Sequence, residues 1–208
     1  MKKYALALAA TVISLSTFAQ KVEEEESGFN WNNVFVGGSL ALGFGSGGYD
    51  GGTSFVIGAN PEIGYSLAEW VDAGLAFNTI FNSIKYTDQT TYLRVKQTSF
   101  NYGVGVFTRL HVIRNFFLQV QPEYNWIAYK AQLLDQPGVP AQKQTVTAGS
   151  ILVGAGYGQR IIGQSSFFTV LMFDLGTEKY SPYRDGYGTA VPIIRGGFNV
   201  YLGGRKKK

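Results

Sequence analysis

Charged side chains stand within segments that are otherwise apolar or small. Each occupies the polar face of a segment in which apolar residues recur at every second position. Alternate residues of a β-strand point to opposite faces, so these charges would share a face without large apolar side chains. Buried carboxylates and guanidiniums are expected to pair, because an unpaired buried charge is costly. The predicted charge network, facing the lumen of a barrel, contains Glu62, Asp72, Arg109, Glu123, Arg160, Asp174 and Arg195, with Asp174 and Arg195 as the expected closest pair.

Other residues with catalytic potential lack the partners that catalysis requires. His111 is the only histidine, cysteine is absent, and no nucleophile or orienting group stands beside His111 in the sequence. The glycines of 154–158 faintly match a dinucleotide fingerprint, but no helix follows them. Inward glycines in a crowded barrel are the preferred interpretation. The sequence therefore predicts no catalytic residue, no cofactor and no metal site, and a protein that is not an enzyme.

Eight segments show the alternation expected of transmembrane β-strands. The seventh is apolar on both faces except at Asp174, which leaves its period ambiguous. Two others contain a Pro-Glu dipeptide, at Pro61 and Pro122, and proline cannot donate to a ladder, so a bulge or kink is expected at each. The segments cover residues 34–45, 54–66, 71–82, 100–110, 116–126, 150–160, 167–175 and 193–202.

The connections between these segments alternate in length. Four are long and polar, near 46–52, 87–96, 132–143 and 177–190, and three are short, near 67–70, 112–114 and 161–164. Eight antiparallel strands place four connections at one end and three at the other, and all the long ones fall in the set of four. Outer-membrane barrels have this asymmetry, with longer loops outside the cell. The predicted fold is an all-β, eight-stranded antiparallel transmembrane β-barrel.

The surroundings of the barrel follow from where lysine occurs. Lys85, Lys96, Lys130, Lys143 and Lys179 all lie in or beside the long connections, and lysine is absent from the segment interiors. A soluble barrel needs polar side chains, usually including lysine, on its outer surface. The absence of lysine from the segment interiors therefore favours apolar faces that point into lipid. The alternative is a soluble barrel with the apolar faces inward, as in a lipocalin.

The N-terminus has the layout of a secretory signal peptide. Lys2 and Lys3 precede an apolar stretch to Phe18, which is too short for a spanning helix and ends at Ala19. The predicted organisation is a signal peptide at 1–19, a short periplasmic tail at 20–31, the barrel at 32–203 and a basic tail at 204–208.

The sequence resembles the outer-membrane β-barrel domain family, and more broadly the small barrels of the OmpA and OmpX type. The resemblance lies in Phe18-Ala19-Gln20, in the strand at 61–65 and in the last strand at 195–202. That last strand is similar to a barrel-assembly signal, which would comprise Arg195, Gly197, Val200 and Leu202. The usual signal ends on a C-terminal aromatic residue, whereas this chain continues through 203–208. The resemblance implies the outer membrane of a Gram-negative cell and recognition by the barrel-assembly machinery.

The expected role is non-enzymatic: envelope stability, or contact with a partner through the external loops. Outer-membrane lipid and lipopolysaccharide are expected partners, a protein partner at the loops is possible, and nucleic acid is not expected because the chain has no basic stripe. A narrow porin-like channel or small-molecule transporter is the alternative. The loop residues that suit partner contact are Tyr49, Tyr92, Tyr180, Tyr183, Tyr187, Arg94, Lys96, Lys143 and Arg184.

Overall fold

The computed structural model describes residues 29–46, 52–88, 90–113, 115–136, 138–184 and 190–203. The chain divides into two units, 1–30 and 31–208, and every strand belongs to the second. The predicted signal peptide, nearly all of the N-terminal tail, and the basic tail lie outside the described residues, as do Tyr49 and Tyr187. These parts of the sequence prediction stay predictions.

Eight antiparallel strands form a closed barrel in which each strand pairs with its sequence neighbours and β8 closes on β1. This confirms the predicted all-β, eight-stranded fold. Among the described residues, no helix is long and apolar enough to span a membrane. A short 3-10 turn, η2 (Trp31–Asn33), leads into the strands, which are β1 (Val34–Ser46), β2 (Thr53–Ala68), β3 (Val71–Thr87), β4 (Arg94–Ile113), β5 (Phe116–Leu133), β6 (Gln142–Gly158), β7 (Ser166–Asp174) and β8 (Ile193–Tyr201).

The strands follow the period-two pattern of the sequence. Burial alternates strictly along β5 from Phe116 to Asn125 and along β7 from Phe167 to Asp174. The alternation in β7 resolves the period that its apolar sequence leaves ambiguous. Side chains of one parity fill the lumen and those of the other parity face outward, as a narrow barrel requires.

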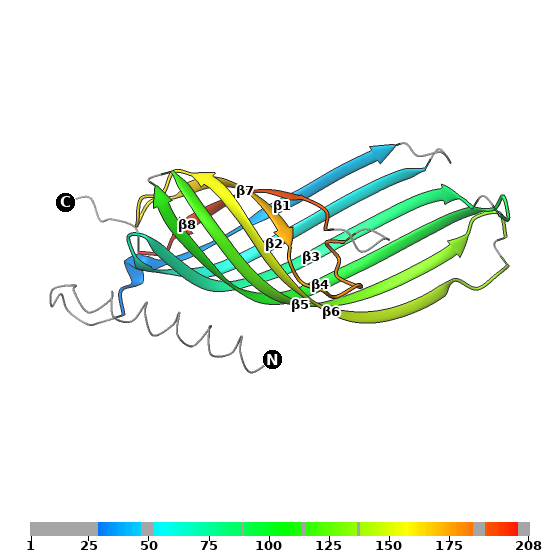
Figure 1. Ribbon diagram of the computed structural model, residues 1–208, viewed down its shortest axis with the longest axis horizontal. Helices are drawn as coiled ribbons and strands as arrows, with labels where there is room; N and C mark the ends of the chain where they lie inside the picture. The colour runs from blue at the N-terminus through cyan, green and yellow to red at the C-terminus, as the bar shows by residue number, and fades with distance from the viewer. Residues whose placement is uncertain are drawn as a thin grey trace. The chain divides into compact units, whose positions relative to one another are not determined.

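The strands differ greatly in length. β3 to β6 contain 17 to 20 residues, whereas β7 and β8 contain nine each. The extra length lies at the end with the connections 47–52, 88–93, 134–141 and 175–192, which we call the long-loop end. The connections 69–70, 114–115 and 159–165 define the short-turn end. Figure 1 shows the long strands continuing past the ends of β7 and β8.

The wall is therefore incomplete toward the long-loop end. β6 pairs with β7 only over Leu152–Gly158, and β1 pairs with β8 only over Phe35–Leu40. The segment 175–192, which joins β7 to β8, begins beside this gap, since the Leu175 amide donates to the Ile151 carbonyl oxygen at 2.9 Å.

Of the bulge or kink expected at each proline, the bulge is wrong. The ladder between β2 and β3 passes from Ala59↔Thr79 to Glu62↔Ala76 in one register, and Pro61 pairs opposite Gly38 on its other side. At Pro122 the ladder with β4 likewise keeps its register. Proline has no N–H group, so it needs no hydrogen-bond acceptor on the neighbouring strand. At each proline, two consecutive residues make no pair with one neighbouring strand, and this accommodates the ring without an extra residue. The register shifts of these ladders lie instead at 66–68 and 111–113, beside short turns.

Candidate functional site in the barrel lumen

Six of the seven predicted charges lie buried in the lumen. Glu62, Asp72, Arg109, Glu123, Asp174 and Arg195 are each at most 7% exposed. Arg160 follows the end of β6 rather than lying within the strand, but its side chain is only 10% exposed and reaches back to Asp72. The structure thus brings all seven residues into one interior, six of them in three groups along the barrel and Asp174 apart from these.

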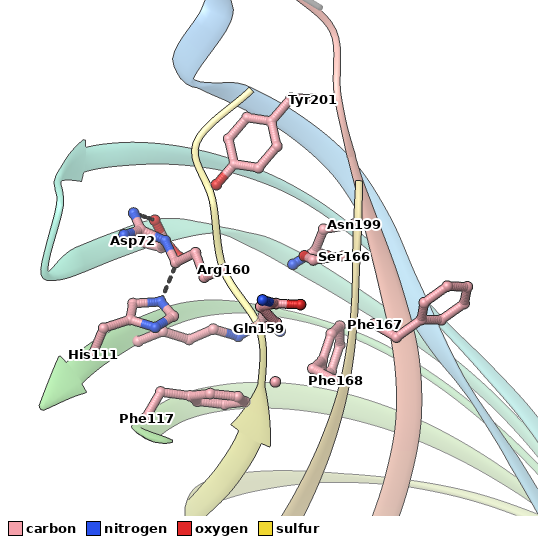
Figure 2. Close-up of a pocket in the computed structure, with 12 residues that line it drawn as sticks. Asp72, His111, Phe117, Gln159, Arg160, Ser166, Phe167, Phe168, Asn199 and Tyr201 are labelled. Atoms are coloured by element: carbon pink, nitrogen blue, oxygen red, sulfur yellow. Dashed lines mark hydrogen bonds and ion pairs between the residues drawn. The ribbon is translucent and has the colours of Figure 1, made fainter. Parts of the chain in front are cut away.

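The group at the short-turn end is centred on Asp72. Its Oδ1 accepts hydrogen bonds from the Ser66 hydroxyl at 2.7 Å and from Arg160 Nη2 at 2.5 Å, and its Oδ2 lies 2.8 Å from His111 Nε2. The Ser66 hydroxyl also lies 2.9 Å from the Tyr201 hydroxyl. Figure 2 shows Asp72, His111 and Arg160 converging from three different elements. The carboxylate therefore joins β2, β3, β4, β8 and the turn after β6 at this end of the barrel.

This group lines a small cavity. Its volume is about 20 Å³, room for about one water molecule. In a serine-type triad the imidazole lies between nucleophile and carboxylate, whereas here Asp72 lies between His111 and Ser66, so the imidazole does not activate the hydroxyl. Among the described residues, no group of three His, Cys, Asp or Glu side chains could hold a metal ion. The geometry supports a structural role for His111.

The middle group is built on Arg109 and Glu62. Arg109 donates from Nη1 and Nη2 to the two Glu62 oxygens at 2.8 and 2.6 Å, and from Nε to Gln119 Oε1 at 2.8 Å. Its guanidinium carbon lies 4.7 and 4.5 Å from the ring centroids of Phe107 and Phe168. A bidentate ion pair held between aromatic rings is among the stronger and more rigid polar contacts in proteins.

A chain of amides links this pair to the third group. Gln119 donates to Gln121 at 2.6 Å, and Gln121 donates to Glu123 Oε1 at 2.6 Å. The other Glu123 oxygen accepts from the Tyr183 hydroxyl at 2.7 Å, while Arg195 Nη2 donates to that hydroxyl oxygen at 3.1 Å. The phenol therefore bridges the carboxylate and the guanidinium, whose closest direct approach is 3.9 Å.

The predicted pairing of Asp174 with Arg195 is wrong. Arg195 lies opposite Val170 in the β7–β8 ladder, four residues before Asp174, which is about 13 Å along the strand. Asp174 instead lies 3.5 Å from Arg184 and accepts from the backbone amide of Ile151 at 2.9 Å. Adjacency of strands in the sequence indicates neighbours but not the register that decides which residues meet.

The segment 175–192 contributes to the lumen, which the sequence did not indicate. Tyr183 is 4% exposed, and Ser181 lies with its hydroxyl 3.0 Å from that of Ser150. The prediction that Tyr183 and Arg184 are available for partner contact is wrong, because Tyr183 is buried and the Arg184 side chain is only 15% exposed and contacts Asp174. Among the other loop residues of this prediction, Tyr92 and Tyr180 are 81% and 52% exposed.

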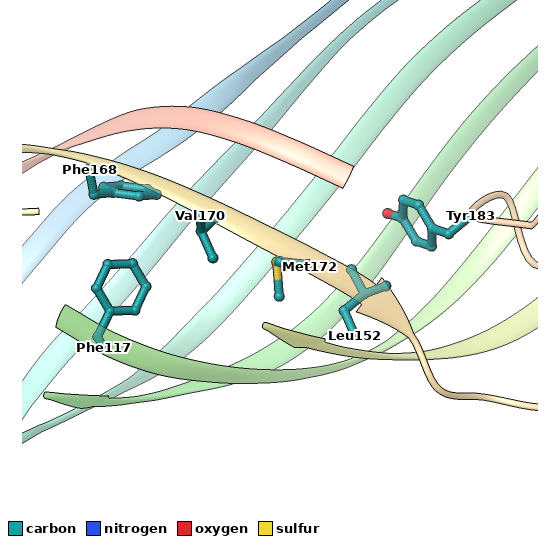
Figure 3. Close-up of a cluster of buried hydrophobic side chains, with 6 residues drawn as sticks. All are labelled: Phe117, Leu152, Phe168, Val170, Met172 and Tyr183. Atoms are coloured by element: carbon teal, nitrogen blue, oxygen red, sulfur yellow. The ribbon is translucent and has the colours of Figure 1, made fainter. Parts of the chain in front are cut away.

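One side of the lumen is apolar rather than charged. Phe168, Val170 and Met172 of β7 face inward and form a cluster with Phe117, Leu152 and Tyr183, as Figure 3 shows. The inward face of β7 carries no charge before Asp174, so the polar groups concentrate on β2 to β5 and on β8. The lumen is filled by a polar network and an apolar cluster packed side by side.

Two aromatic rings lie over glycines of the neighbouring strand. The Phe117 ring covers Gly156 and the Phe35 ring covers Gly64, each opposite its glycine in the ladder. A Cβ atom at either glycine would overlap the ring, so the absence of a side chain is what allows the ring to lie flat against the wall. This supports the interpretation of the glycines at 154–158 as relief of crowding.

The residues of the predicted assembly signal divide between the two faces of β8. Arg195 is buried and Gly197 lies beneath the Phe168 ring, while Val200 and Leu202 are 39% and 52% exposed on the outside. Their recognition by an assembly machinery stays a prediction.

The outside of the barrel is apolar along every strand. On β5, Phe116, Leu118, Val120 and Tyr124 face outward with 43% to 54% of their surface exposed. The alternative of a soluble barrel with inward apolar faces is wrong for this reason. The exposed apolar side chains include Leu40, Ile57, Ile63, Leu75, Phe77, Phe100, Tyr102, Val106, Ile151, Tyr157, Phe167, Leu171, Ile194 and Phe198.

The long-loop end has polar contacts of its own. Asp135 accepts from Arg94 Nη2 at 2.6 Å and from the Arg94 backbone amide at 2.7 Å. Hydrogen bonds from the Arg94 side chain lower the pKa of the Asp135 carboxyl, and hydrogen bonds from Thr91 lower the pKa of Asp88. Both acids are therefore charged at neutral pH and hold the ends of their loops.

Comparison with known proteins gives only weak likenesses. No family model matches this chain, and no curated protein matches its sequence. Among solved structures, the translocator domain of the autotransporter NalP from Neisseria meningitidis is 10% identical, with 96% of this chain and 97% of that chain covered and a TM-score of 0.43. The transport unit of the autotransporter AIDA-I from Escherichia coli is 15% identical, with 89% and 70% covered and a TM-score of 0.40. The N-terminal β-barrel domain of Pseudomonas aeruginosa OprF is 14% identical, with 80% and 96% covered and a TM-score of 0.35. These scores are too low to assign a relative, so the function proposed below rests on this chain's own residues.

Proposed function

We propose that this chain is an integral outer-membrane barrel without enzymatic activity, which stabilises the envelope and presents its long loops outside the cell. The observation that carries the proposal is the inverted distribution of side chains, with charges buried in the lumen and large apolar residues exposed on every strand. Water would penalise such a surface, whereas the hydrocarbon of a bilayer stabilises it.

The height of the apolar surface fits a bilayer. On β5 it extends from Phe116 at the short-turn end to Trp126, which stacks on Tyr102 with ring centroids 5.5 Å apart. About ten residue steps at roughly 3.3 Å each, tilted by roughly 45°, rise by about 23 Å, close to the apolar band of about 25 Å in such barrels. Aromatic residues at both limits, among them Trp70 and Phe116 at one and Tyr102 and Trp126 at the other, suit the two interfaces.

The filled lumen supports a structural role over a channel. The ion pairs, the amide chain and the Tyr183 ring occupy the interior at successive heights, and an eight-stranded barrel is only just wide enough for its own side chains. The loop asymmetry supports an orientation with the long-loop end outside, in which β1 would begin and β8 would end on the periplasmic side.

Depth-dependent fluorescence quenching tests the bilayer position. In a background with Trp31, Trp70 and Trp126 replaced by phenylalanine, tryptophan is restored at 126 or introduced at Val120. We expect a lipid brominated on its acyl chain near the headgroup to quench the tryptophan at 126 most. A lipid brominated near the end of its acyl chain should quench the tryptophan at 120 most. Equal and weak quenching of the two tryptophans, whichever brominated lipid is used, would contradict the proposal. Single-molecule conductance of the same protein should show no stable open level, and a large steady conductance would favour the channel instead.

A further inference from the structure

Four lysines form a continuous arc on the outer wall, just beyond the apolar surface at the long-loop end. Lys85, Lys96, Lys130 and Lys143 belong to β3, β4, β5 and β6 in that order. Each has the same parity as the exposed apolar residues of its strand, and none of these ladders shifts register between the apolar surface and the lysine. All four therefore point outward; Lys85, Lys130 and Lys143 are exposed, and Lys96 is half-buried.

The ladders place these lysines next to one another. Lys85 lies directly opposite Lys96, and Lys130 lies directly opposite Lys143. Lys96 lies opposite Gln132, which makes Lys130 its diagonal neighbour. Opposite positions are about 5 Å apart at Cβ and diagonal positions about 7 Å. The four ammonium groups thus form one patch, which we call the lysine arc.

Like charges directly opposite each other destabilise a sheet, and this arc contains two such pairs. Within the described part of the chain, no carboxylate lies within 4.0 Å of any of the four ammonium groups. The acid at this end of β5, Asp135, is paired with Arg94 instead. Anions from outside the chain would relieve the repulsion within the arc.

The height of the arc matches the headgroup layer of a bilayer. Lys85, Lys96 and Lys130 each lie four residues beyond an aromatic residue of the same face, namely Phe81, Phe100 and Trp126. Four residues rise about 13 Å along a strand and about 9 Å along the bilayer normal at a tilt of 45°, and lysine stems can bend back toward the interface. The headgroup region on each side of a bilayer is roughly 5–8 Å thick.

We propose that the lysine arc binds the phosphate groups of lipids in the leaflet that surrounds the long-loop end. The proposal rests on the proposed function, because it requires the apolar surface beneath the arc to lie in hydrocarbon. A lipid with its acyl chains against Phe100, Tyr102 and Trp126 would carry its phosphates at the height of the ammonium groups. The arc crosses four strands, so it suits a headgroup with more than one phosphate better than a single phosphodiester.

The test compares two lipids that differ only in phosphate. Full-length protein in detergent is titrated with diphosphoryl or monophosphoryl lipid A of the same acyl composition, and bound lipid is counted by native mass spectrometry. We expect wild-type protein to bind the diphosphoryl form more tightly. Lys130→Gln should weaken that binding about fivefold, equivalent to about 1 kcal/mol for one lysine near a lipid surface. Lys130→Arg should retain it, and Lys179→Gln, the same charge change in the exposed segment after β7, should leave it unchanged.

Three outcomes would overturn the proposal: equal wild-type affinity for both lipids, equal effects of Lys130→Gln and Lys179→Gln, or displacement of the lipid by inorganic phosphate at matched phosphate concentration. The last would indicate a site for free phosphate rather than lipid. Quenching of the tryptophan at 126 in vesicles separates this proposal from the proposed function. Loss of phosphate preference with normal quenching rejects the lysine arc alone, whereas a wild-type protein that shows no insertion rejects both.

Discussion

Replacing Arg109 by methionine should greatly destabilise the barrel. The substitution removes both hydrogen bonds to Glu62 and the contacts with two aromatic rings, and it leaves the Glu62 carboxylate buried without its cation. The side chains of the pair are only 3% and 6% exposed, so solvent screens the pair little. Removing one partner of a buried ion pair lowers the unfolding free energy by about 3–5 kcal/mol, a factor of roughly 10² to 10⁴ in the folding equilibrium.

Urea unfolding in lipid vesicles, followed by tryptophan fluorescence, measures this loss. Arg94→Met is the matched control: that arginine pairs with Asp135 while 66% exposed, so solvent screens the pair and the variant should lose much less stability than Arg109→Met. The double variant Glu62→Gln with Arg109→Met should recover a large part of the loss, since no buried charge remains alone. Equal losses in Arg109→Met and Arg94→Met would refute the reasoning and indicate a water-filled lumen.

Two further substitutions test how the lumen is packed. Gly156→Val should lose about 1–3 kcal/mol of unfolding free energy because the new side chain overlaps the Phe117 ring, while Ala155→Val on the outer face should change little. The same urea titrations measure both variants, and equal unfolding free energies of the two would contradict this packing. Tyr183→Ala should raise the conductance of single barrels by removing the ring from the lumen at the long-loop end, whereas Tyr92→Ala, at an 81% exposed position, should leave the conductance unchanged. If Tyr183→Ala also left the conductance unchanged, the Tyr183 ring would not be what closes the lumen to ions.

Period-two alternation is a strong local signal, and it sufficed to predict eight strands, their order and the faces on which the charges lie. The same signal placed Glu62 and Arg109 on inward faces because each stands between outward apolar residues. It also placed the boundaries of the short turns closely. Strand length at the long-loop end was not predicted, because the outward positions turn polar there, as at Lys85 and Lys130, and the outward apolar residues that mark a membrane-spanning strand end before them.

Pairing within the lumen could not be predicted for a different reason. Which charges meet depends on register and on segments without periodicity, so no pattern in the sequence indicated that Tyr183 of the segment 175–192 reaches Glu123 in the lumen. The Asp174–Arg195 pairing failed on register, and no bulge forms at Pro61 or Pro122 because the ladder keeps its register and leaves two positions unpaired on one side of each proline. The partners of His111 came from β3, and no sequence neighbour of His111 could have indicated Asp72.

The most direct test of the central claim, that the outer face lies in a bilayer, is the effect of one arginine on stability. Val120 faces outward near the middle of the apolar surface and is 43% exposed, and Thr145 faces outward on β6 beyond that surface. In vesicles, Val120→Arg should lower the unfolding free energy by about 2–4 kcal/mol, and Thr145→Arg by less than about 1 kcal/mol. If the outer surface lay in water, either substitution would change the unfolding free energy by no more than about 0.5 kcal/mol. Equal and small effects of the two arginines would contradict the account.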